Sequence, residues 1–194
     1  MLITLERLIG TPVMSLQTGG ELARTSNILV DPRDLTIAAY ELEGKMLDSH
    51  PSFIRPTDIR ELSNLGFIVD SSDEFVGLDD VIKIKQVHDF NFHLIGLDVI
   101  DEKNRKLGKV TSFTVDSGSF SIQQLAVKRP LLKSFNETEL LIHRSQIVKV
   151  QNSHIQVKST SEKEPASNTL REYTNPFRNT NVQPEAIDFE TRWH

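Results

Sequence analysis

The chain has 194 residues, a formal net charge of −5 and no cysteine, which excludes disulfide bonds, thiolate metal sites and cysteine nucleophiles and suits a reducing cytoplasm. The mildly acidic balance argues against a protein that binds nucleic acid mainly through its phosphates, although a local basic patch would still allow it. No apolar run approaches the roughly 20 residues needed to span a bilayer, and the N-terminal residues lack the features of a signal peptide, so we expect a cytoplasmic protein without a membrane span.

An internal repeat organises most of the chain. Leu8-Ile9-Gly10 recurs as Leu94-Ile95-Gly96, and farther on Val30-Asp31 recurs as Val115-Asp116. The sequence distance between the two copies differs by one residue between these two matches. This difference falls in turn-like segments, where an insertion costs least. Because spacing, residue class and turn position agree, the sequence predicts two related β units of about 75 residues each.

Each unit has the pattern of short strands and tight turns. In the second copy Phe113 and Val115 share one parity and therefore one face of a strand, whereas Val110 has the opposite parity. A β-bulge near Thr111 or Ser112 would let Val110 face inward as well and would bend the strand. Residues 30–34 and 115–119 are predicted hairpin turns, and residues 36–42 and 120–128 the return strands.

A third pattern closes each unit, in which a strand end, a tight turn and a further apolar residue follow one another. It occurs at Ile54–Ile59, Val76–Val81 and Ile142–Ile147, so the first half has two candidate closing segments, and we expect Ile54–Val69 to close the first barrel. Asp79–Val87 is expected to be an extra strand or connector. The predicted domains are a first barrel over 1–78, a connector or extra strand over 79–93, a second barrel over 94–158 and a flexible tail over 159–194.

The segments LIG-x-x-V, LGKV-x-x-F-x-VD and LLIHRSQIVKV together resemble the PRC-barrel domain, and the second copy is the better match. The first copy departs from the pattern at Thr11-Pro12, Ala23 and Thr25. The resemblance implies an all-β fold of two small PRC-type β-barrels in tandem, and a C-terminal tail that is expected from its composition to be disordered follows them. PRC-barrels occur in the H subunit of photosynthetic reaction centres and in ribosome maturation factors of the RimM type, so the fold implies no single activity.

One basic segment is a candidate binding site, and Pro130 within it marks a loop or strand edge. It could bind an acidic partner or RNA phosphates through its cations, with two leucines as apolar anchors. The alternative is a solvated turn whose leucines fold over a barrel end. The candidate residues are Lys128, Arg129, Leu131, Leu132 and Lys133.

No pattern in the sequence predicts a catalytic, cofactor or metal site. His88 and His93 are five residues apart in a segment expected to be extended, which places them on opposite faces. Neither phosphate-binding glycine pattern occurs. A small barrel filled with side chains also leaves no substrate pocket, so we expect no enzyme and no cofactor.

The tail from Ser159 begins with a polar, proline-containing segment that is expected to be disordered, and aromatic residues follow. Phe177, Phe189 and Trp193 could form a short motif that folds on a partner or back onto the barrels, and the alternative is an inert terminus. The leading hypothesis is a non-catalytic adaptor that binds a protein partner through barrel edges or this tail. The runner-up is a RimM-like factor that associates with RNA or the ribosome. An exposed edge strand could also make a homodimer.

Overall fold

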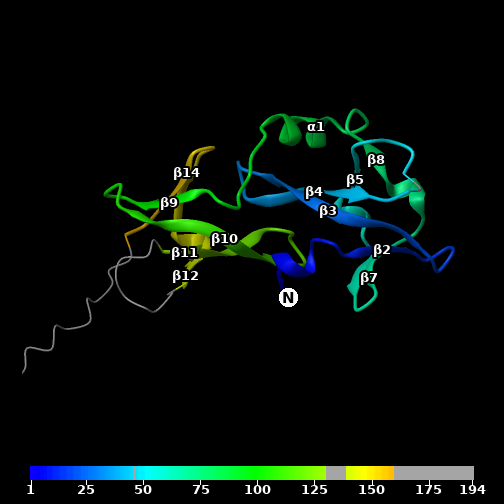
Figure 1. Ribbon diagram of the computed structural model, residues 1–194, viewed down its shortest axis with the longest axis horizontal. Coiled ribbons are helices and arrows are strands. Elements are labelled where there is room, and N and C mark those ends of the chain that lie inside the picture. Colours follow the sequence, from blue (N-terminus) through cyan, green and yellow to red (C-terminus); the bar gives the residue numbers. More distant parts are fainter. Residues whose placement is uncertain (46, 130–138, 160–194) are drawn as a thin grey trace, which may run out of the picture. The chain divides into compact units, whose positions relative to one another are not determined.

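The computed structural model describes residues 1–45, 47–129 and 139–159 (Figure 1). These residues form two sheets of seven strands each. The expected all-β class is confirmed in its coarse form, because strands dominate and α1 (Ile82–Asp89) is the one α-helix of the described part of the chain. Each sheet has two end strands, and among these residues the two end strands of a sheet do not pair with each other. The strand pairing therefore does not show barrel closure.

The first sheet contains the strands of the first half in the order β6-β7-β2-β3-β4-β5-β8. Neighbouring strands are antiparallel except β2 and β7, which pair in parallel. The bounds are β2 (Pro12–Ser15), β3 (Glu21–Asp31), β4 (Thr36–Glu43), β5 (Ser52–Ile54), β6 (Glu61–Ser63), β7 (Gly66–Val69) and β8 (Val76–Gly77), with the 3-10 helices η2 (Pro56–Asp58) and η3 (Ser72–Glu74).

The second sheet has the order β12-β11-β10-β9-β14-β13, and β9 and β14 pair in parallel. An additional strand, β1, pairs with β10 from outside this path. The bounds are β1 (Leu2–Thr4), β9 (Asp98–Asp101), β10 (Lys106–Asp116), β11 (Ile122–Lys128), β12 (Glu139–His143), β13 (Ile147–Val150) and β14 (His154–Val157), with the 3-10 helices η1 (Leu5–Arg7) and η4 (Arg144–Gln146).

The two sheets share one strand order. The series β6-β7-β2-β3-β4-β5 of the first sheet corresponds to β13-β14-β9-β10-β11-β12 of the second. The bulge expected near Thr111 or Ser112 is confirmed, because the register of β10 shifts between Val110 and Ser112. The first sheet has the matching shift between Thr25 and Asn27. The internal repeat of the sequence therefore corresponds to a repeat of strand topology.

The hairpin turns of the two halves contact each other reciprocally. The backbone N–H of Ile37 donates to the carbonyl of Phe120, and the N–H of Ile122 donates to the carbonyl of Leu35, both at 2.9 Å. Ile37 and Leu35 are the repeat counterparts of Ile122 and Phe120, which lie 85 positions later. Such exchange of equivalent contacts is the pattern of an isologous, two-fold interface. Buried residues of both sheets also belong to one hydrophobic cluster.

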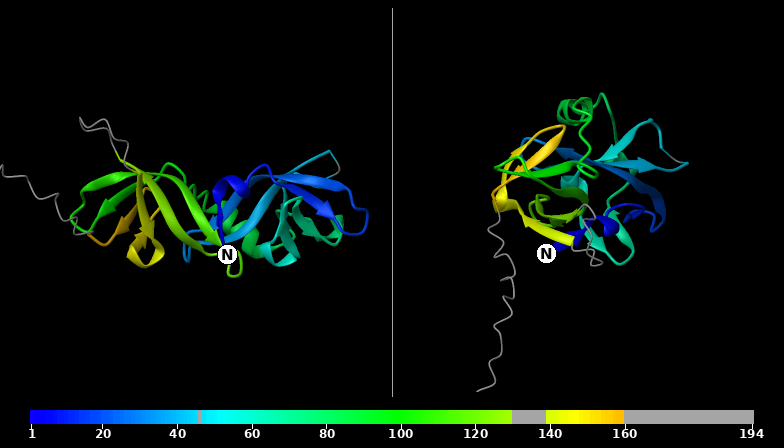
Figure 2. Two further views of the ribbon diagram at one scale, coloured as in Figure 1. Left: turned by 90° about the horizontal axis from the view of Figure 1, so that it is seen from below. Right: turned by 60° about the vertical axis from the view of Figure 1, so that its left-hand side comes forward.

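The segment that precedes each half packs on the other half. The strand β1, at the N-terminus, pairs with β10 (Figure 2). In this pairing Ile3 lies opposite Val115. The helix α1, which precedes the second half, lies over the first sheet (Figure 1). At its C-terminal end Phe90 stacks on the guanidinium of Arg33, 5.5 Å from the ring centre. Each half is therefore packed against a segment that precedes the other half in the sequence.

Of the two alternatives expected for Asp79–Val87, an extra strand or a connector, the strand is wrong, because α1 occupies most of this segment. The alternation of Ile82 and Ile84 with lysines has the period of a strand, and this suggested a strand. In the helix, Ile84 and Val87 are buried against the first sheet, whereas Ile82 is 76% exposed. The spacing of three residues between the two buried positions is the helical signal.

Candidate binding groove

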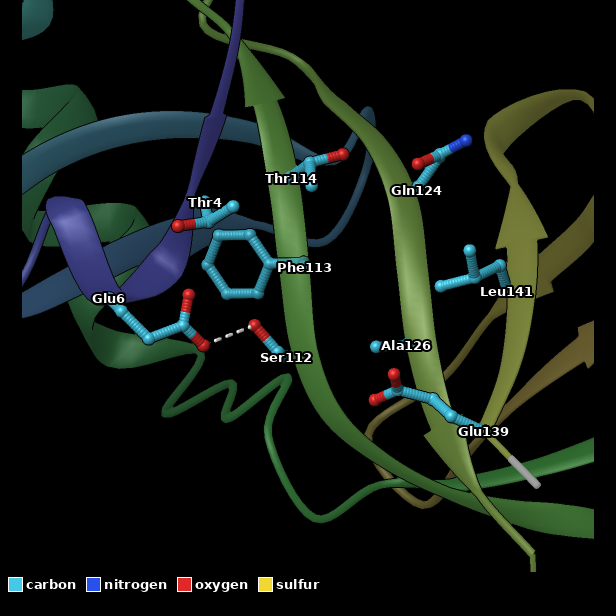
Figure 3. Close-up of a pocket in the computed structure, with 9 residues that line it drawn as sticks. All are labelled: Thr4, Glu6, Ser112, Phe113, Thr114, Gln124, Ala126, Glu139 and Leu141. Carbon is cyan, nitrogen blue, oxygen red and sulfur yellow. Dashed lines mark hydrogen bonds between the residues drawn. The ribbon is translucent and has the colours of Figure 1, made fainter. Parts of the chain in front are cut away.

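A groove of about 230 Å³ lies on the second sheet, bordered by η1 on one side and β12 on the other (Figure 3). Cross-strand register explains its floor. Thr114 of β10 pairs with Thr4 of β1 and with Gln124 of β11, and alternate residues of a strand project to the same side. The lining residues are Thr4, Glu6, Ser112, Phe113, Thr114, Gln124, Ala126, Glu139 and Leu141.

Two carboxylates project over the groove from its two borders, Glu6 from η1 and Glu139 from β12 (Figure 3). The hydroxyl of Ser112 donates to Oε1 of Glu6 at 2.8 Å. The backbone N–H of Glu6 and the hydroxyls of Ser112 and Thr4 hold the pKa of this carboxyl below its ordinary value. Glu6 is therefore ionised at neutral pH, and this border of the groove is anionic.

The groove also contains polar and apolar atoms that lack partners. The buried hydroxyl oxygen of Thr114 makes no hydrogen bond within the described part of the chain. Leu141 is 60% exposed although it lies in a strand of the sheet. Buried polar atoms are normally paired, so the hydroxyl of Thr114 is the unusual feature of the groove, and Leu141 adds an apolar surface beside it.

The same face of the first sheet is covered. Strand register and the repeat place Leu29, Ala39 and Phe53 at the positions of Thr114, Gln124 and Leu141. These three residues are buried together with Ile84 and Val87 of α1. Strand β5, the counterpart of β12, also pairs with β8 on its outer edge, whereas β12 pairs with β11 alone among the described residues.

The predicted basic site is described only in part. Lys128 is the last residue of β11, opposite Lys109 of β10 and Glu139 of β12, and Arg129 follows it. Glu139 lines the groove, whereas Lys128 is not one of its lining residues. The remaining predicted partner-binding residues lie outside the described residues: Leu131, Leu132, Lys133, Phe177, Phe189 and Trp193.

Neighbouring cations that could widen a basic patch are paired with acids. The ammonium groups of Lys106 and Lys109 lie 2.8 and 3.0 Å from the carboxylate of Asp98. Hydrogen bonds from these two lysines hold the pKa of Asp98 below its ordinary value. Arg105 pairs in the same way with Asp101 at 2.7 Å. These three cations therefore lie beside acids that would repel a phosphate.

The described residues contain neither a candidate metal cluster nor a helix that could span a membrane. Within residues 1–45, 47–129 and 139–159, no three His, Asp or Glu side chains lie close enough together to hold a metal ion. The helices of the same residues are too short and too polar to cross a bilayer. His88 and His93, considered above as ligands, lie at the end of α1 and beyond it rather than in a strand.

The groove itself was not predicted from the sequence. Leu141 stands in the run Leu140-Leu141-Ile142, which suggests a wholly buried strand end. The parity of the buried Ile142 was the available signal, since its neighbour Leu141 must then face outward. Glu6 gave no signal, because its place beside Ser112 depends on the pairing of β1 with β10, across more than 100 residues of sequence.

Comparison with known proteins supports the resemblance found in the sequence. The PRC-barrel domain family matches residues 90–164, which confirms the resemblance for the second half. A crystal structure of a 16S ribosomal RNA processing protein, RimM from Pseudomonas aeruginosa, is similar with a TM-score of 0.28 and 19% identity, over 82% of this chain and 98% of that one. The search of curated proteins gave no match. At this identity and TM-score, the similarity to RimM assigns no activity to the present chain.

Proposed function

We propose that this PRC-barrel protein is a non-catalytic adaptor that binds a segment of a partner protein in the groove of the second sheet. The open face between η1 and β12 supports this proposal, since the equivalent face of the first sheet is covered by α1 and β8. We also propose that the first half is a second PRC-like unit, on the basis of its strand order. The compartment stays a prediction, and a cysteine-free chain suits the cytoplasm.

The chemistry of the groove favours an extended peptide. The outer edge of β12 offers backbone groups to a further strand, and strand addition is a common mode of peptide recognition. Leu141 provides an apolar anchor beside that edge. The hydroxyl of Thr114 and the amide of Gln124 can hydrogen-bond the same peptide.

Charge defines the partner further. Glu6 and Glu139 lie on opposite borders of the groove, and the pKa of Glu6 is lowered. A partner segment with one or two cations flanking an apolar residue fits this arrangement best. Because Glu6 is held ionised, it is also poorly suited to donate a proton, which supports a binding role over a catalytic one.

A second candidate function is association with RNA or the ribosome. Its supporting observation is that Lys109 and Lys128 are cross-strand neighbours, with Arg129 next in the chain. Asp98 beside Lys109 and Glu139 opposite Lys128 weaken a phosphate-binding role. We therefore place the protein partner first.

The test compares two leucine substitutions in a pull-down at physiological salt. Leu141→Glu adds a third acid to the groove and should abolish capture of the partner. Leu65→Glu is the matched control, because Leu65 is 69% exposed in the turn between β6 and β7 of the first sheet. Circular dichroism should show that both variants fold. Equal capture by the two variants would refute the groove as the binding site.

The same experiment distinguishes the RNA alternative. Lys128→Ala with Arg129→Ala should leave protein capture unchanged if the adaptor proposal is right. RNA or ribosomal particles that are captured by the unmodified chain and lost with these two changes would establish the second candidate instead. Capture of a second copy of the chain, lost with Leu141→Glu, would identify a homodimer surface and would contradict the adaptor.

A further inference from the structure

Two hydrogen bonds show which backbone groups of β12 face its outer edge. The backbone N–H of His143 donates to Oε1 of Gln146 at 2.8 Å, so it does not bond to Gln124, which lies opposite in β11. The carbonyl of Ala126 in β11 accepts a hydrogen bond from the hydroxyl of Thr111 at 3.2 Å and therefore faces β10. Both observations indicate that these positions of β11 and β12 do not exchange backbone hydrogen bonds.

The alternation of an antiparallel ladder extends this result along β12. Hydrogen-bonded and non-hydrogen-bonded residue pairs alternate between two antiparallel strands. Leu141, opposite Ala126, is therefore in a non-hydrogen-bonded pair with β11, and so is Glu139, two residues earlier. The N–H and C=O groups of these two residues point to the outer edge. Among the described residues β12 pairs only with β11, so these groups are open to a further strand.

The first sheet contains a strand at the equivalent edge. Phe53 of β5 has the place of Leu141, because it lies opposite Glu41, and Glu41 is the repeat counterpart of Ala126. On the outer side of β5, the antiparallel strand β8 places Val76 opposite Phe53. Val76 packs against the same apolar cluster as Phe53. The first sheet thus indicates an antiparallel direction and an apolar residue at the position opposite Leu141.

The carboxylate of Glu139 adds a charge preference. Glu139 and Leu141 both line the groove from β12 (Figure 3). In an antiparallel strand, the residue opposite Glu139 comes two positions after the residue opposite Leu141. Opposite charges on directly facing residues stabilise a strand pair, so a cation is favoured there. Glu139 also faces Lys128 of β11, and a carboxylate can accept hydrogen bonds from donors on both sides.

We propose that the groove binds an extended segment antiparallel to β12, with an apolar residue opposite Leu141 and a lysine or arginine two positions later, opposite Glu139. The apolar residue of the segment exchanges two backbone hydrogen bonds with Leu141. The inference rests on the proposed function, because it specifies the direction, register and sequence pattern of the partner segment. It makes Glu139 and Leu141 the specificity-determining residues of the groove.

Peptides test the direction with the full chain. The probe is acetyl-Thr-Gln-Thr-Val-Thr-Lys-Thr-amide, and the control is the reversed sequence acetyl-Thr-Lys-Thr-Val-Thr-Gln-Thr-amide, which has the same composition. In NMR titrations of the isotope-labelled protein, we expect the probe to shift the amide signals of Glu139 and Leu141, with a Kd of about 1 mM or lower. The reversed sequence should bind about 5-fold more weakly, since its antiparallel register puts the lysine opposite His143.

N-methylation of the probe tests the register. A methyl group on the valine nitrogen removes the donor that faces the carbonyl of Leu141 and should abolish binding. A methyl group on the nitrogen of the following threonine is the matched control, because that nitrogen faces away from β12. The control peptide should keep most of the affinity of the probe.

Exchange of charges tests the pairing with Glu139. Glu139→Lys should weaken binding of the probe about 5-fold and should favour a peptide in which glutamate replaces the lysine. Glu61→Lys is the control, because Glu61 is an exposed residue of β6 in the first sheet. It should leave the affinities of both peptides unchanged.

Several results would overturn the inference. These are the absence of any shift at Glu139 and Leu141, equal effects of the two N-methyl groups, and equal affinities for the probe and the reversed sequence. Tighter binding of the reversed sequence would indicate a parallel segment and would also overturn it. So would a dimer of the chain that dissociates with Leu141→Glu, because a second copy would then occupy the edge.

Failure of the proposed function gives a different result. Peptide binding with the expected direction and register, but without any captured protein that is lost with Leu141→Glu, would refute the adaptor and leave the inferred binding mode. A captured protein that is lost with Leu141→Glu, together with equal affinities for the probe and the reversed sequence, would overturn the inferred binding mode alone.

Discussion

Asp31 is a buried carboxylate that holds the turn after β3. Its oxygens accept hydrogen bonds from the backbone N–H of Arg33 at 3.0 Å and from the guanidinium of Arg33 at 2.9 and 2.7 Å. The hydrogen bonds of the Arg33 side chain are the main reason that the pKa of Asp31 lies below its ordinary value, and burial opposes them. Arg33 in turn stacks on Phe90, so this carboxylate links the turn to the segment after α1.

The stabilisation by Asp31 should depend on pH. A carboxyl with a lowered folded-state pKa stabilises the fold fully above its unfolded pKa of about 3.9, and this contribution is lost as pH falls through the folded value. We expect Asp31→Asn to lower the free energy of unfolding by about 1–3 kcal/mol at pH 7 and by less below pH 4. Urea unfolding at pH 7, 5 and 3 measures this, with Asp73→Asn at an exposed turn as control. A deficit that stays constant with pH would contradict the assignment.

Gly108 is required by a close approach of two backbones. Its φ is +156°, and a Cβ built there would lie 2.2 Å from the carbonyl oxygen of Lys128. We expect Gly108→Ala to destabilise the protein by about 3 kcal/mol or more, from backbone strain and overlap together. Gly19→Ala, at φ +69° with nothing within 4 Å, should cost only about 1–2 kcal/mol. Equal losses in thermal unfolding would exclude the overlap as the cause.

Single residues account for what could be predicted about the strands. The parity of Val110 predicted the bulge in β10, because that side chain reaches the core only if the strand bends. The hydroxyl of Thr114 makes no hydrogen bond to another described residue, and this was not predictable, since a partner for it depends on tertiary packing. The local sequence pattern thus predicts which face of a strand a side chain lies on. It does not predict the tertiary contacts of that side chain.

At the scale of elements, η4 joins the two halves through one side chain. The guanidinium of Arg144 donates to the carbonyls of Ile122 at 3.1 Å and Leu35 at 3.3 Å, and also to the carbonyl of Asp34. Three backbone acceptors from the two facing turns therefore share one cation. A single arginine provides this because its donors are held in a rigid planar group.

We expect Arg144→Ala to lower the free energy of unfolding by about 2–3 kcal/mol, because hydrogen bonds of a charged donor to three carbonyls are lost. Arg144→Lys should recover only part of this, since an ammonium cannot reach all three acceptors. Arg60→Ala, which removes an exposed ion pair with Asp70, is the control and should have a smaller effect. Guanidinium chloride unfolding at neutral pH is the measurement, and a loss equal to that of Arg60→Ala would refute the role of Arg144 between the halves.

The helix α1 shows where element prediction failed and why. Its sequence alternates apolar and charged residues at the start, so the local pattern indicated a strand. The apolar face of the first sheet selects the helix instead, because Ile84 and Val87 both reach Leu29 and Phe53 only at helical spacing. Tertiary packing therefore determined the secondary structure of a segment whose local sequence preference was ambiguous.

At the scale of the whole molecule, duplication explains most of the fold. The repeat in the sequence predicted two related β units, and the structure has two sheets of the same strand order. Two features could not be predicted from the repeat, because both join segments that are distant in sequence. These are the pairing of β1 with β10 and the reciprocal contacts between the hairpin turns. Among the described residues, the first sheet is covered by α1 and the corresponding face of the second sheet carries the groove.

The most direct test of the central claim is the salt dependence of what the full chain captures. A partner segment held by a strand edge and Leu141 should remain bound between about 0.1 and 0.5 M salt. Its affinity should change little over this range, because few charges take part in the binding. It should also withstand Lys128→Ala with Arg129→Ala. A captured RNA whose binding falls steeply and log-linearly over the same range, and disappears with those two changes, would contradict the adaptor and establish a nucleic-acid partner.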